Sequence, residues 1–299
     1  MSQALSETLA RVRAAVDARL PGLLVRGPAA DLPEHPGDPL TAAAREALLS
    51  PGKRVRPGLV FLAGELFGAK EDRLLDPACA VEMIHAASLA LDDLPSMDDA
   101  TTRRGRPALH AVHGEDLAIL AAMTLVVRAF GVLAEAGLTT VKPAAALDLV
   151  SRLADASGLW GLSSGQALDL RTGEADASFD RLETIHARKT GALFVAAAEF
   201  GAVLGGARER ELAAVRSYAK NVGLAFQIVD DLLEKEDPAR TGKQARRAPA
   251  PTFVRHVGED GARRLVAELT LHAVEALEPF GARAARLREF ASLLRDRSA

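Results

Sequence analysis

The chain has 299 residues, with 37 Lys and Arg against 40 Asp and Glu, so its net charge at pH 7 is −3. Hydrophobic residues make up 48% and aromatic residues only 4%, a composition that supports a large core and excludes a disordered protein. The near-neutral charge, with one Trp and one Tyr, argues against nucleic-acid binding, and the single cysteine, Cys79, excludes an intrachain disulfide and fits a reducing compartment.

The predicted elements are helices along the whole chain. Ala, Leu, Glu and Arg dominate, apolar residues recur three and four positions apart, and no alternating strand pattern is convincing. The pattern predicts an all-α protein, and the lack of repeats or composition shifts favours one domain over residues 1–299. The expected helices cover roughly 3–20, 40–49, 53–67, 77–94, 115–135, 143–155, 158–171, 179–205, 208–236, 259–277 and 282–296.

Neither a targeting signal nor a membrane span is expected. Residues 1–20 mix charged and apolar side chains and lack the unbroken apolar centre of a signal peptide. The longest apolar run, Leu117 to Val127, is shorter than the ~18 residues that a span requires. These features predict a cytoplasmic protein.

An acidic cluster follows the apolar run 81–91. Asp92, Asp93, Asp98 and Asp99 place four carboxylates within eight residues, where the partial negative charge of a helix C-terminus disfavours them further. One interpretation is a solvated acidic turn. The other is a site for a hard divalent cation, which prefers carboxylate oxygens and, for magnesium, shares its shell with substrate phosphates.

A second acidic cluster lies 138 residues later, at Asp230, Asp231 and Glu234. Asp230 and Glu234 are four residues apart, so on a helix both carboxylates lie on one face. Two such clusters, each at the end of an apolar helix, are hard to explain as surface decoration. In a helical bundle they can face one another across a cavity.

Basic segments alternate with the acidic ones. Three cations lie in residues 53–56 and three more in residues 103–106, and Lys189 and Thr190 lie within a helical pattern. Each segment alone could be a solvated face. Carboxylates, magnesium and Arg or Lys side chains are, however, the groups that diphosphate chemistry uses.

In this order and spacing the segments resemble trans-isoprenyl diphosphate synthases, in particular the bacterial geranylgeranyl diphosphate synthases of carotenoid pathways. The resemblance runs from about residue 51 to residue 258. The segments that carry it are 51–57 (PGKRVRP), 82–120 (around ALDDLPSMDDATTRRGRP), 165–170 (GQALDL), 185–194 (IHARKTGALF) and 223–234 (GLAFQIVDDLLE).

The resemblance implies a single helical bundle around a deep cavity, a homodimer, and Mg²⁺ ions that hold an allylic diphosphate (dimethylallyl, geranyl or farnesyl). It places the metal ligands at Asp92, Asp98, Asp230, Asp231 and Glu234. It assigns catalytic roles to these aspartates with Asp93, and to Arg103 and Lys189. The allylic diphosphate would contact Arg103, Lys189, Thr190, Gln227 and Lys243, and isopentenyl diphosphate would contact Lys53, Arg56, His85 and Arg104.

Helix geometry bears on product length. Ser88, Ala87 and Ile84 precede Asp92 by four, five and eight residues, so they lie below it on one helix face, where a growing prenyl tail would run. Ala87 and Ser88 are small, whereas shorter-product members of the family carry an aromatic residue there. The expected product is C20 geranylgeranyl diphosphate, with farnesyl diphosphate as the alternative.

The chain departs from the family pattern after Lys243. The family usually has a further Asp and then a Lys before Thr252, whereas residues 244–251 read QARRAPAP. This departure motivates a second hypothesis, a non-catalytic paralogue that acts as a regulatory subunit or prenyl-diphosphate binder. A related terpene cyclase is a third hypothesis, which the complete Lys53 and Arg56 motif disfavours.

Overall fold

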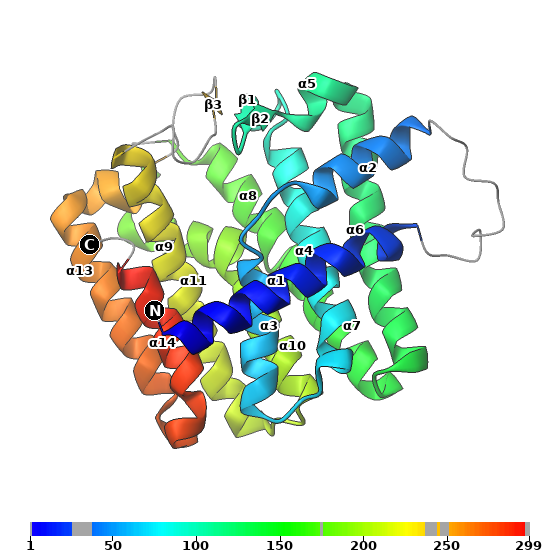
Figure 1. Ribbon diagram of the computed structural model, residues 1–299. Coiled ribbons are helices and arrows are strands. Elements are labelled where there is room, and N and C mark those ends of the chain that lie inside the picture. The colour runs from blue at the N-terminus through cyan, green and yellow to red at the C-terminus, as the bar shows by residue number, and fades with distance from the viewer. Residues whose placement is uncertain (1, 26–37, 174–175, 237–243, 246–250, 297–299) are drawn as a thin grey trace.

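A computed structural model of the chain describes residues 2–25, 38–173, 176–236, 244–245 and 251–296. The all-α fold predicted from the sequence is confirmed: helices pack as a bundle in which α1 crosses one face and two sets of helices flank the centre (Figure 1). The flanking helices are α1 (Gln3–Leu24), α2 (Pro39–Leu49), α5 (Leu109–His113), α6 (Glu115–Thr139), α7 (Pro143–Ser157), α8 (Leu162–Arg171), α9 (Phe179–His186), α11 (Glu209–Glu236), α13 (Phe253–Ala276), η4 (Glu278–Ala284) and α14 (Ala285–Asp296).

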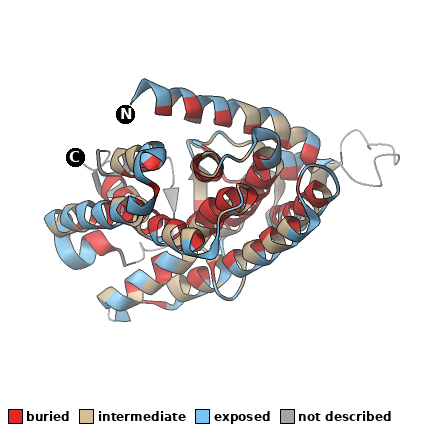
Figure 2. Ribbon diagram, turned by 90° about the horizontal axis from the view of Figure 1, so that it is seen from below, coloured by how far each residue is buried: buried red, intermediate tan, exposed pale blue. Residues whose placement is uncertain are grey.

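Three helices form the centre of the bundle: α3 (Val55–Leu66), α4 (Glu71–Asp92) and α10 (Ala192–Leu204). Almost every side chain of α3 and α10 is buried, and Figure 2 shows such buried helices enclosed by helices with one exposed face. A Cβ atom built on Gly201 of α10 would lie 2.1 Å from the carbonyl oxygen of Val60 in α3. The two helices therefore pack backbone against backbone.

Side-chain caps fix where several helices begin. The hydroxyl of Ser2 accepts a hydrogen bond from the Leu5 amide at 3.2 Å, and Asp38 accepts bonds from the first amides of α2. Thr252 accepts a bond from the Arg255 amide at 3.3 Å and so begins α13. Each cap satisfies an amide that has no partner within its own helix.

The helix predicted over 179–205 is interrupted. Between α9 and α10 lies η3, a π-helical turn at Ala187–Gly191. A Cβ atom on Gly165 of α8 would lie 2.2 Å from the backbone nitrogen of Lys189. A Cβ atom on Gly223 of α11 would lie 3.0 Å from the Cα of Gly191. The turn is therefore held between two helices at backbone distance. Such turns are frequent at functional sites.

A small sheet also departs from the prediction, which included no strands. Strand β1 (Ala100–Arg103) pairs antiparallel with β2 (Arg106–Pro107) and with β3 (Gln244–Ala245), in the order β2-β1-β3. Strands of two to four residues are too short for an alternating apolar pattern to show in the sequence. The sheet brings residue 244 beside Thr102.

Two helices, α4 and α6, are long and apolar enough to cross a membrane by length and composition alone, which differs from the sequence prediction. The run that the sequence showed, 117–127, is only part of α6. Of the most apolar window of each helix, 67% is buried in α4 but only 39% in α6. Helix α4 is thus a core helix of the bundle, whereas α6 leaves apolar side chains on its outer face.

Beside the main core, a second hydrophobic core joins α9, α11 and α13, and it contains His186. The ring of His186 packs 5.2 Å from that of Phe253, measured between centroids, and neither ring nitrogen has a hydrogen-bond partner among the described residues. Burial lowers the pKa of His186 to about 4, against the opposing charge of Asp169. The neutral ring is therefore the form that this core accepts.

We predict that Gly201→Ala destabilises the protein. The added methyl overlaps the α3 backbone, which cannot move without separating the two central helices, so the free energy of unfolding should fall by roughly 1–3 kcal/mol. Urea unfolding followed by circular dichroism measures the change. Gly22→Ala in α1 is the matched control, because no atom lies within 4 Å of its added Cβ; equal losses in both variants would contradict the packing argument.

We also predict that His186 makes folding stability depend on pH. Its pKa is about 4 in the folded chain and about 6.5 in the unfolded chain, so the unfolded state binds more protons between these values and stability falls as the pH drops. The loss from this one group should reach roughly 2–3 kcal/mol by pH 4.5. In His186→Phe the decline in unfolding free energy from pH 7 to 4.5 should be smaller by that amount. An identical decline would show that His186 does not titrate in this window.

Candidate active site

The first acidic cluster forms a tight turn at the end of α4. The Asp98 amide donates to the Asp92 carbonyl at 2.9 Å, and the Ala100 amide donates to the Asp93 carbonyl at 3.1 Å, so the chain folds back into β1. The Asp92 and Asp98 side chains are half-buried and Asp93 is buried. The cluster is therefore not a uniformly solvated acidic turn.

Asp93 and Arg103 form an ion pair that joins α4 to β1. The Arg103 Nε donates to the two carboxylate oxygens of Asp93 at 3.0 and 3.1 Å, and Nη2 also contacts the carboxylate. Burial lowers the pKa of Arg103, but the bond to Asp93 and the charges of Asp92 and Asp98 outweigh it and raise the pKa. Asp93 is thus bonded to Arg103, whereas Asp92 and Asp98 act on Arg103 through their charge.

Lys189 reaches the same cluster from the π-helical turn. Its Nζ donates to the Asp169 Oδ2 of α8 at 2.6 Å. Burial lowers the pKa of Lys189, but Asp92, Asp169 and Asp98 outweigh burial and raise it. Lys189 thus lies within reach of the charge of the first cluster. Sequence reasoning assigned no role to Asp169, although it lies in the GQALDL segment, because its carboxylate has no helical neighbour that marks it.

A hydrogen-bonded chain ties the π-helical turn to the second acidic cluster. The Thr190 hydroxyl donates to the Gln227 Oε1 at 2.7 Å, and the Gln227 Nε2 donates to the Asp231 Oδ1 at 2.9 Å. Asp231 is buried and Asp230 is half-buried on α11. The side chain of Glu234 and the whole of Lys243 lie outside the described residues.

The predicted basic residues meet at the start of α3. Arg56 is buried with its guanidinium 4.9 Å from the centre of the Phe194 ring, and its Nε has no hydrogen-bond partner among the described residues. Burial lowers the pKa of Arg56 to about 10, although the charges of Glu82 and Asp230 oppose it. The influence of Asp230 places the second acidic cluster near this arginine. A buried cation with an unsatisfied donor favours an anionic ligand.

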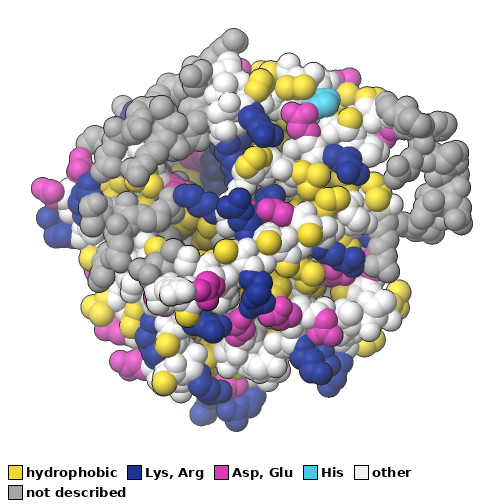
Figure 3. Space-filling model, viewed as in Figure 1, with side chains coloured by type: hydrophobic (Ala, Val, Ile, Leu, Met, Phe, Trp, Pro, Cys, Tyr) yellow, Lys and Arg dark blue, Asp and Glu magenta, His cyan; other side chains and the backbone are white. Residues whose placement is uncertain are grey.

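His85, Arg104 and Lys53 complete this basic group. Burial lowers the pKa of His85 well below its usual value, and four arginines, first among them Arg56, lower it further. The exposed Arg104 donates to the Pro51 carbonyl at 2.5 Å, and Lys53 is exposed on the same segment. Figure 3 shows Lys and Arg side chains over both the upper and the lower part of one face, with carboxylates among them.

The predicted product-length residues lie inside the bundle. Ile84, Ala87 and Ser88 of α4 are 3%, 1% and 9% exposed, and the Ser88 hydroxyl donates to the His85 carbonyl at 2.9 Å. They occupy the turns of α4 that precede Asp92. The same helix therefore carries the acidic cluster at its end and the small side chains beneath it.

The aspartates of the two acidic clusters have the oxygen ligands that a magnesium ion prefers. Within the described residues no group of three or more His, Cys, Asp or Glu is close enough to hold a metal ion. Magnesium commonly takes one or two carboxylates and completes its shell with water and substrate phosphates, so a protein-only cage is not required. Asp92 and Asp98 at the end of α4, and Asp230 and Asp231 on α11, are carboxylates of the kind that fit magnesium brought by a diphosphate.

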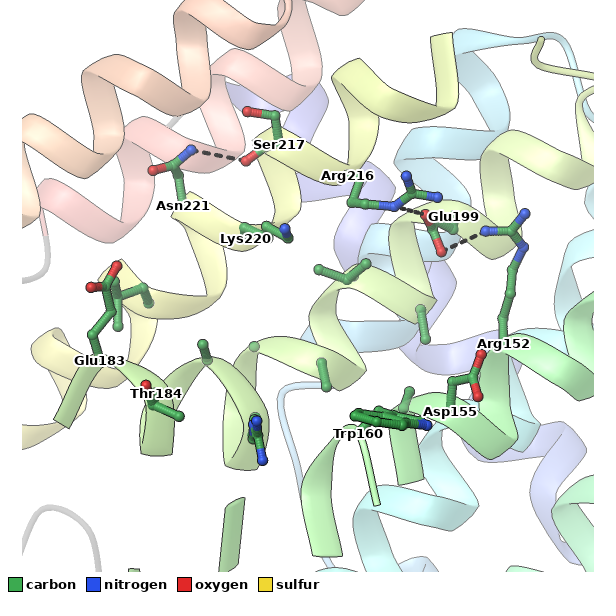
Figure 4. Close-up of a pocket in the computed structure, with 18 of the residues that line it drawn as sticks. Arg152, Asp155, Trp160, Glu183, Thr184, Glu199, Arg216, Ser217, Lys220 and Asn221 are labelled. Carbon is green, nitrogen blue, oxygen red and sulfur yellow. Dashed lines mark hydrogen bonds and ion pairs between the residues drawn. The ribbon is translucent and has the colours of Figure 1, made fainter. Parts of the chain in front are cut away.

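A cavity lies beside the π-helical turn, where Ala187, Arg188 and Gly191 form part of its wall. It has a volume of about 740 Å³, and Trp160, Lys220 and Asn221 line it (Figure 4). The buried Glu199 closes one end by accepting bonds from Arg152 at 2.7 Å and Arg216 at 2.6 Å. None of the predicted site residues lines this cavity.

Comparisons with known proteins agree with the site. The family model described as polyprenyl synthetase matches residues 38–278. Geranylgeranyl pyrophosphate synthase 11, chloroplastic, of Arabidopsis thaliana is 43% identical over 252 residues, which are 81% of this chain and 71% of that protein. An FPP/GFPP synthase of Zymomonas mobilis superposes with a TM-score of 0.87 at 33% identity, covering 98% of this chain and 100% of that one.

These relatives correct the predicted cytoplasmic location. Several are named chloroplastic, and one is named mitochondrial, which contradicts that prediction. The prediction depended on a single cysteine and on the absence of a signal-peptide pattern in residues 1–20. Neither feature separates one reducing compartment from another.

The resemblance found in the sequence is therefore confirmed over most of the chain. The matched range 38–278 contains both acidic clusters and the basic residues that converge with them. The chain belongs to the polyprenyl synthetase family and is a prenyltransferase.

Proposed function

We propose that this prenyltransferase condenses isopentenyl diphosphate with an allylic diphosphate and that its main product is geranylgeranyl diphosphate. The observation that carries the proposal is that cations and acidic clusters come together: Arg103 is bonded to Asp93 of the first cluster, and Lys189 lies within reach of the charges of Asp92 and Asp98. Arg56 in turn lies within reach of the charge of Asp230. Two diphosphates can be held there, one beside each set of cations.

In this proposal the allylic diphosphate lies at the end of α4. Asp92, Asp98, Asp230 and Asp231, with Glu234, would hold magnesium, which supplies positive charge to the leaving diphosphate. Arg103 and Lys189 contact the same oxygens and stabilise the negative charge that grows as the C–O bond breaks. Gln227 and Thr190 orient this end through their mutual hydrogen bond, and Lys243 is proposed as a further contact.

Isopentenyl diphosphate is proposed to bind Lys53, Arg56, His85 and Arg104. His85 is neutral at pH 7, so its ring can hydrogen-bond isopentenyl diphosphate without adding charge. The allylic carbocation is attacked by the isopentenyl double bond, and a proton then leaves the new chain. No side-chain nucleophile is required for this sequence of steps.

Residues 244–251 differ from the family pattern, and this difference favours a second candidate function, a non-catalytic prenyl-diphosphate binder. Gln244 and Ala245 form β3, which pairs with Thr102 and Ala100 immediately before Arg103. The departing segment thus begins beside the proposed allylic site, where loss of the usual Asp could slow turnover while binding is retained. An activity assay separates the two functions.

We predict that the purified chain with Mg²⁺ elongates dimethylallyl, geranyl or farnesyl diphosphate with labelled isopentenyl diphosphate to C20 products. Chromatography of the dephosphorylated products measures their length. Chelation of divalent ions should abolish elongation, because the leaving diphosphate then lacks the metal. Binding of the diphosphates without elongation of any primer would instead favour the binder.

Ala87→Phe should shift the product from C20 toward C15. Ala87 is buried beneath Asp92, and a phenyl ring there would lie across the path along which the prenyl tail is proposed to grow. Equal product lengths in Ala87→Phe and the wild-type chain would contradict the proposed tail path.

We also propose that the protein is a homodimer that pairs through α6. Ile119, Leu120, Met123 and Val127 are 47%, 41%, 57% and 66% exposed and lie on one face of this helix. Contiguous exposed apolar side chains on a helix are typical of an interface, and a two-fold pair lets the same face cover itself.

Met123→Glu is expected to convert the dimer to a monomer, because the interface would bury two unpaired carboxylates. Sedimentation velocity measures the oligomeric state. Leu271→Glu, at a 56% exposed position on α13, is the control and should remain dimeric. A wild-type chain that sediments as a monomer at micromolar concentration would contradict the α6 interface.

A further inference from the structure

The segment that carries Lys53 and Arg56 contains a third cation that points into the protein. Arg54 precedes α3 in the left-handed region of the backbone, with φ of 49°, and its side chain is only 4% exposed. This conformation is uncommon for a residue with a side chain and persists only where the surroundings enforce it. The contacts of the Arg54 guanidinium therefore decide the shape of the segment.

Arg54 binds three parts of the chain at once. Its Nη1 donates to the Glu82 Oε1 of α4 at 2.7 Å, its Nε donates to the Asp17 Oδ1 of α1 at 2.7 Å, and its Nη2 donates to the Ser50 carbonyl at 3.2 Å. The Glu82 side chain is also only 4% exposed, whereas that of Asp17 is 42% exposed. Glu82 is thus the buried partner that holds the guanidinium in place.

The segment is also held from its other side. Arg104 donates to the Pro51 carbonyl at 2.5 Å, and a Cβ atom on Gly52 would lie 2.9 Å from Arg104 Nη1 and 3.2 Å from Arg54 Nη1. Residues 51–54 therefore run between two guanidinium groups. The positions of Lys53 and Arg56 follow from this confinement.

We infer that Arg54 and Glu82 are positioning residues for isopentenyl diphosphate: their buried ion pair fixes the turn from which Lys53 and Arg56 reach the diphosphate, and neither touches it. The inference rests on the proposed function, since it assigns the isopentenyl site to these two cations. It adds two residues that the motif assignments do not include.

The charge of Glu82 and the position that Glu82 enforces have opposite effects on diphosphate binding. Glu82 raises the pKa of the nearby Arg56 and Arg104, so its negative charge reaches the proposed binding cations. If charge alone mattered, removing it would make the site more positive and tighten diphosphate binding. If position matters, removing it frees the turn and weakens binding.

A comparison of Glu82→Gln with Arg54→Lys separates the effect of charge from the effect of position. Glu82→Gln removes a negative charge, whereas Arg54→Lys retains the positive charge and loses the three-way fork. Positioning predicts that in both variants the KM for isopentenyl diphosphate rises about tenfold or more, while the KM for farnesyl diphosphate and kcat change less than about twofold. Thermal unfolding of each variant is recorded beside the kinetics.

Asp17→Asn is the matched control, because it alters a half-exposed partner of the same guanidinium and leaves the Glu82 bond in place. Its KM for isopentenyl diphosphate should stay within about twofold of the wild-type value. Should Glu82→Gln fail to fold, the double variant Arg54→Gln with Glu82→Gln leaves no lone buried charge, and it should show the same raised KM.

Three results would overturn the inference: an unchanged KM with a lowered unfolding temperature, a lowered KM in Glu82→Gln, or equal rises in both KM values. A wild-type chain that elongates no primer would contradict the proposed function instead. Calorimetric titration with isopentenyl diphosphate would then decide the inference, which expects weaker binding by both variants than by the wild-type chain.

Discussion

The ion pair between Asp93 and Arg103 is the interaction on which the rest of the site depends. It binds the last turn of α4 to the strand that follows, at a helix end where the backbone itself carries partial negative charge. The charges of Asp92 and Asp98, at the end of α4 and in the turn after it, also act on Arg103. Arg104, in the turn directly after this strand, donates to the Pro51 carbonyl, so the chain on either side of this position contacts both basic groups.

The sequence was sufficient where function depends on local spacing. The acidic clusters end apolar helices, and on a helix a separation of four residues is enough to place two side chains on one face. For the same reason the small residues beneath Asp92 could be located before the structure was known. The central helices could be predicted because almost all of their side chains are apolar, as in α3 and α10.

What the sequence did not reveal depends on contacts between distant segments. The π-helical turn at 187–191 contains the weak helix formers Thr190 and Gly191, but these residues do not by themselves specify a π-helix. The close approach of Gly165 and Gly223 from two other helices shows why the turn is held there. Asp169 and Glu82 have no local pattern that distinguishes them from other acidic residues on helices. Each acquires its role from a cation that lies at least 20 residues away in the chain.

The two basic groups differ in how their charge is balanced. At the proposed allylic end, Arg103 pairs with Asp93 and Lys189 pairs with Asp169. The magnesium proposed for this end would add the positive charge that a diphosphate needs there.

At the isopentenyl end the balance is reversed. The buried carboxylate of Glu82 is bonded to Arg54, and among the described residues no carboxylate forms an ion pair with Arg56 or Arg104. That end has an excess of positive charge and can bind a diphosphate directly. This distribution of charge supports the proposal that isopentenyl diphosphate is bound by cations of the protein, beside an allylic diphosphate that is proposed to be held with magnesium.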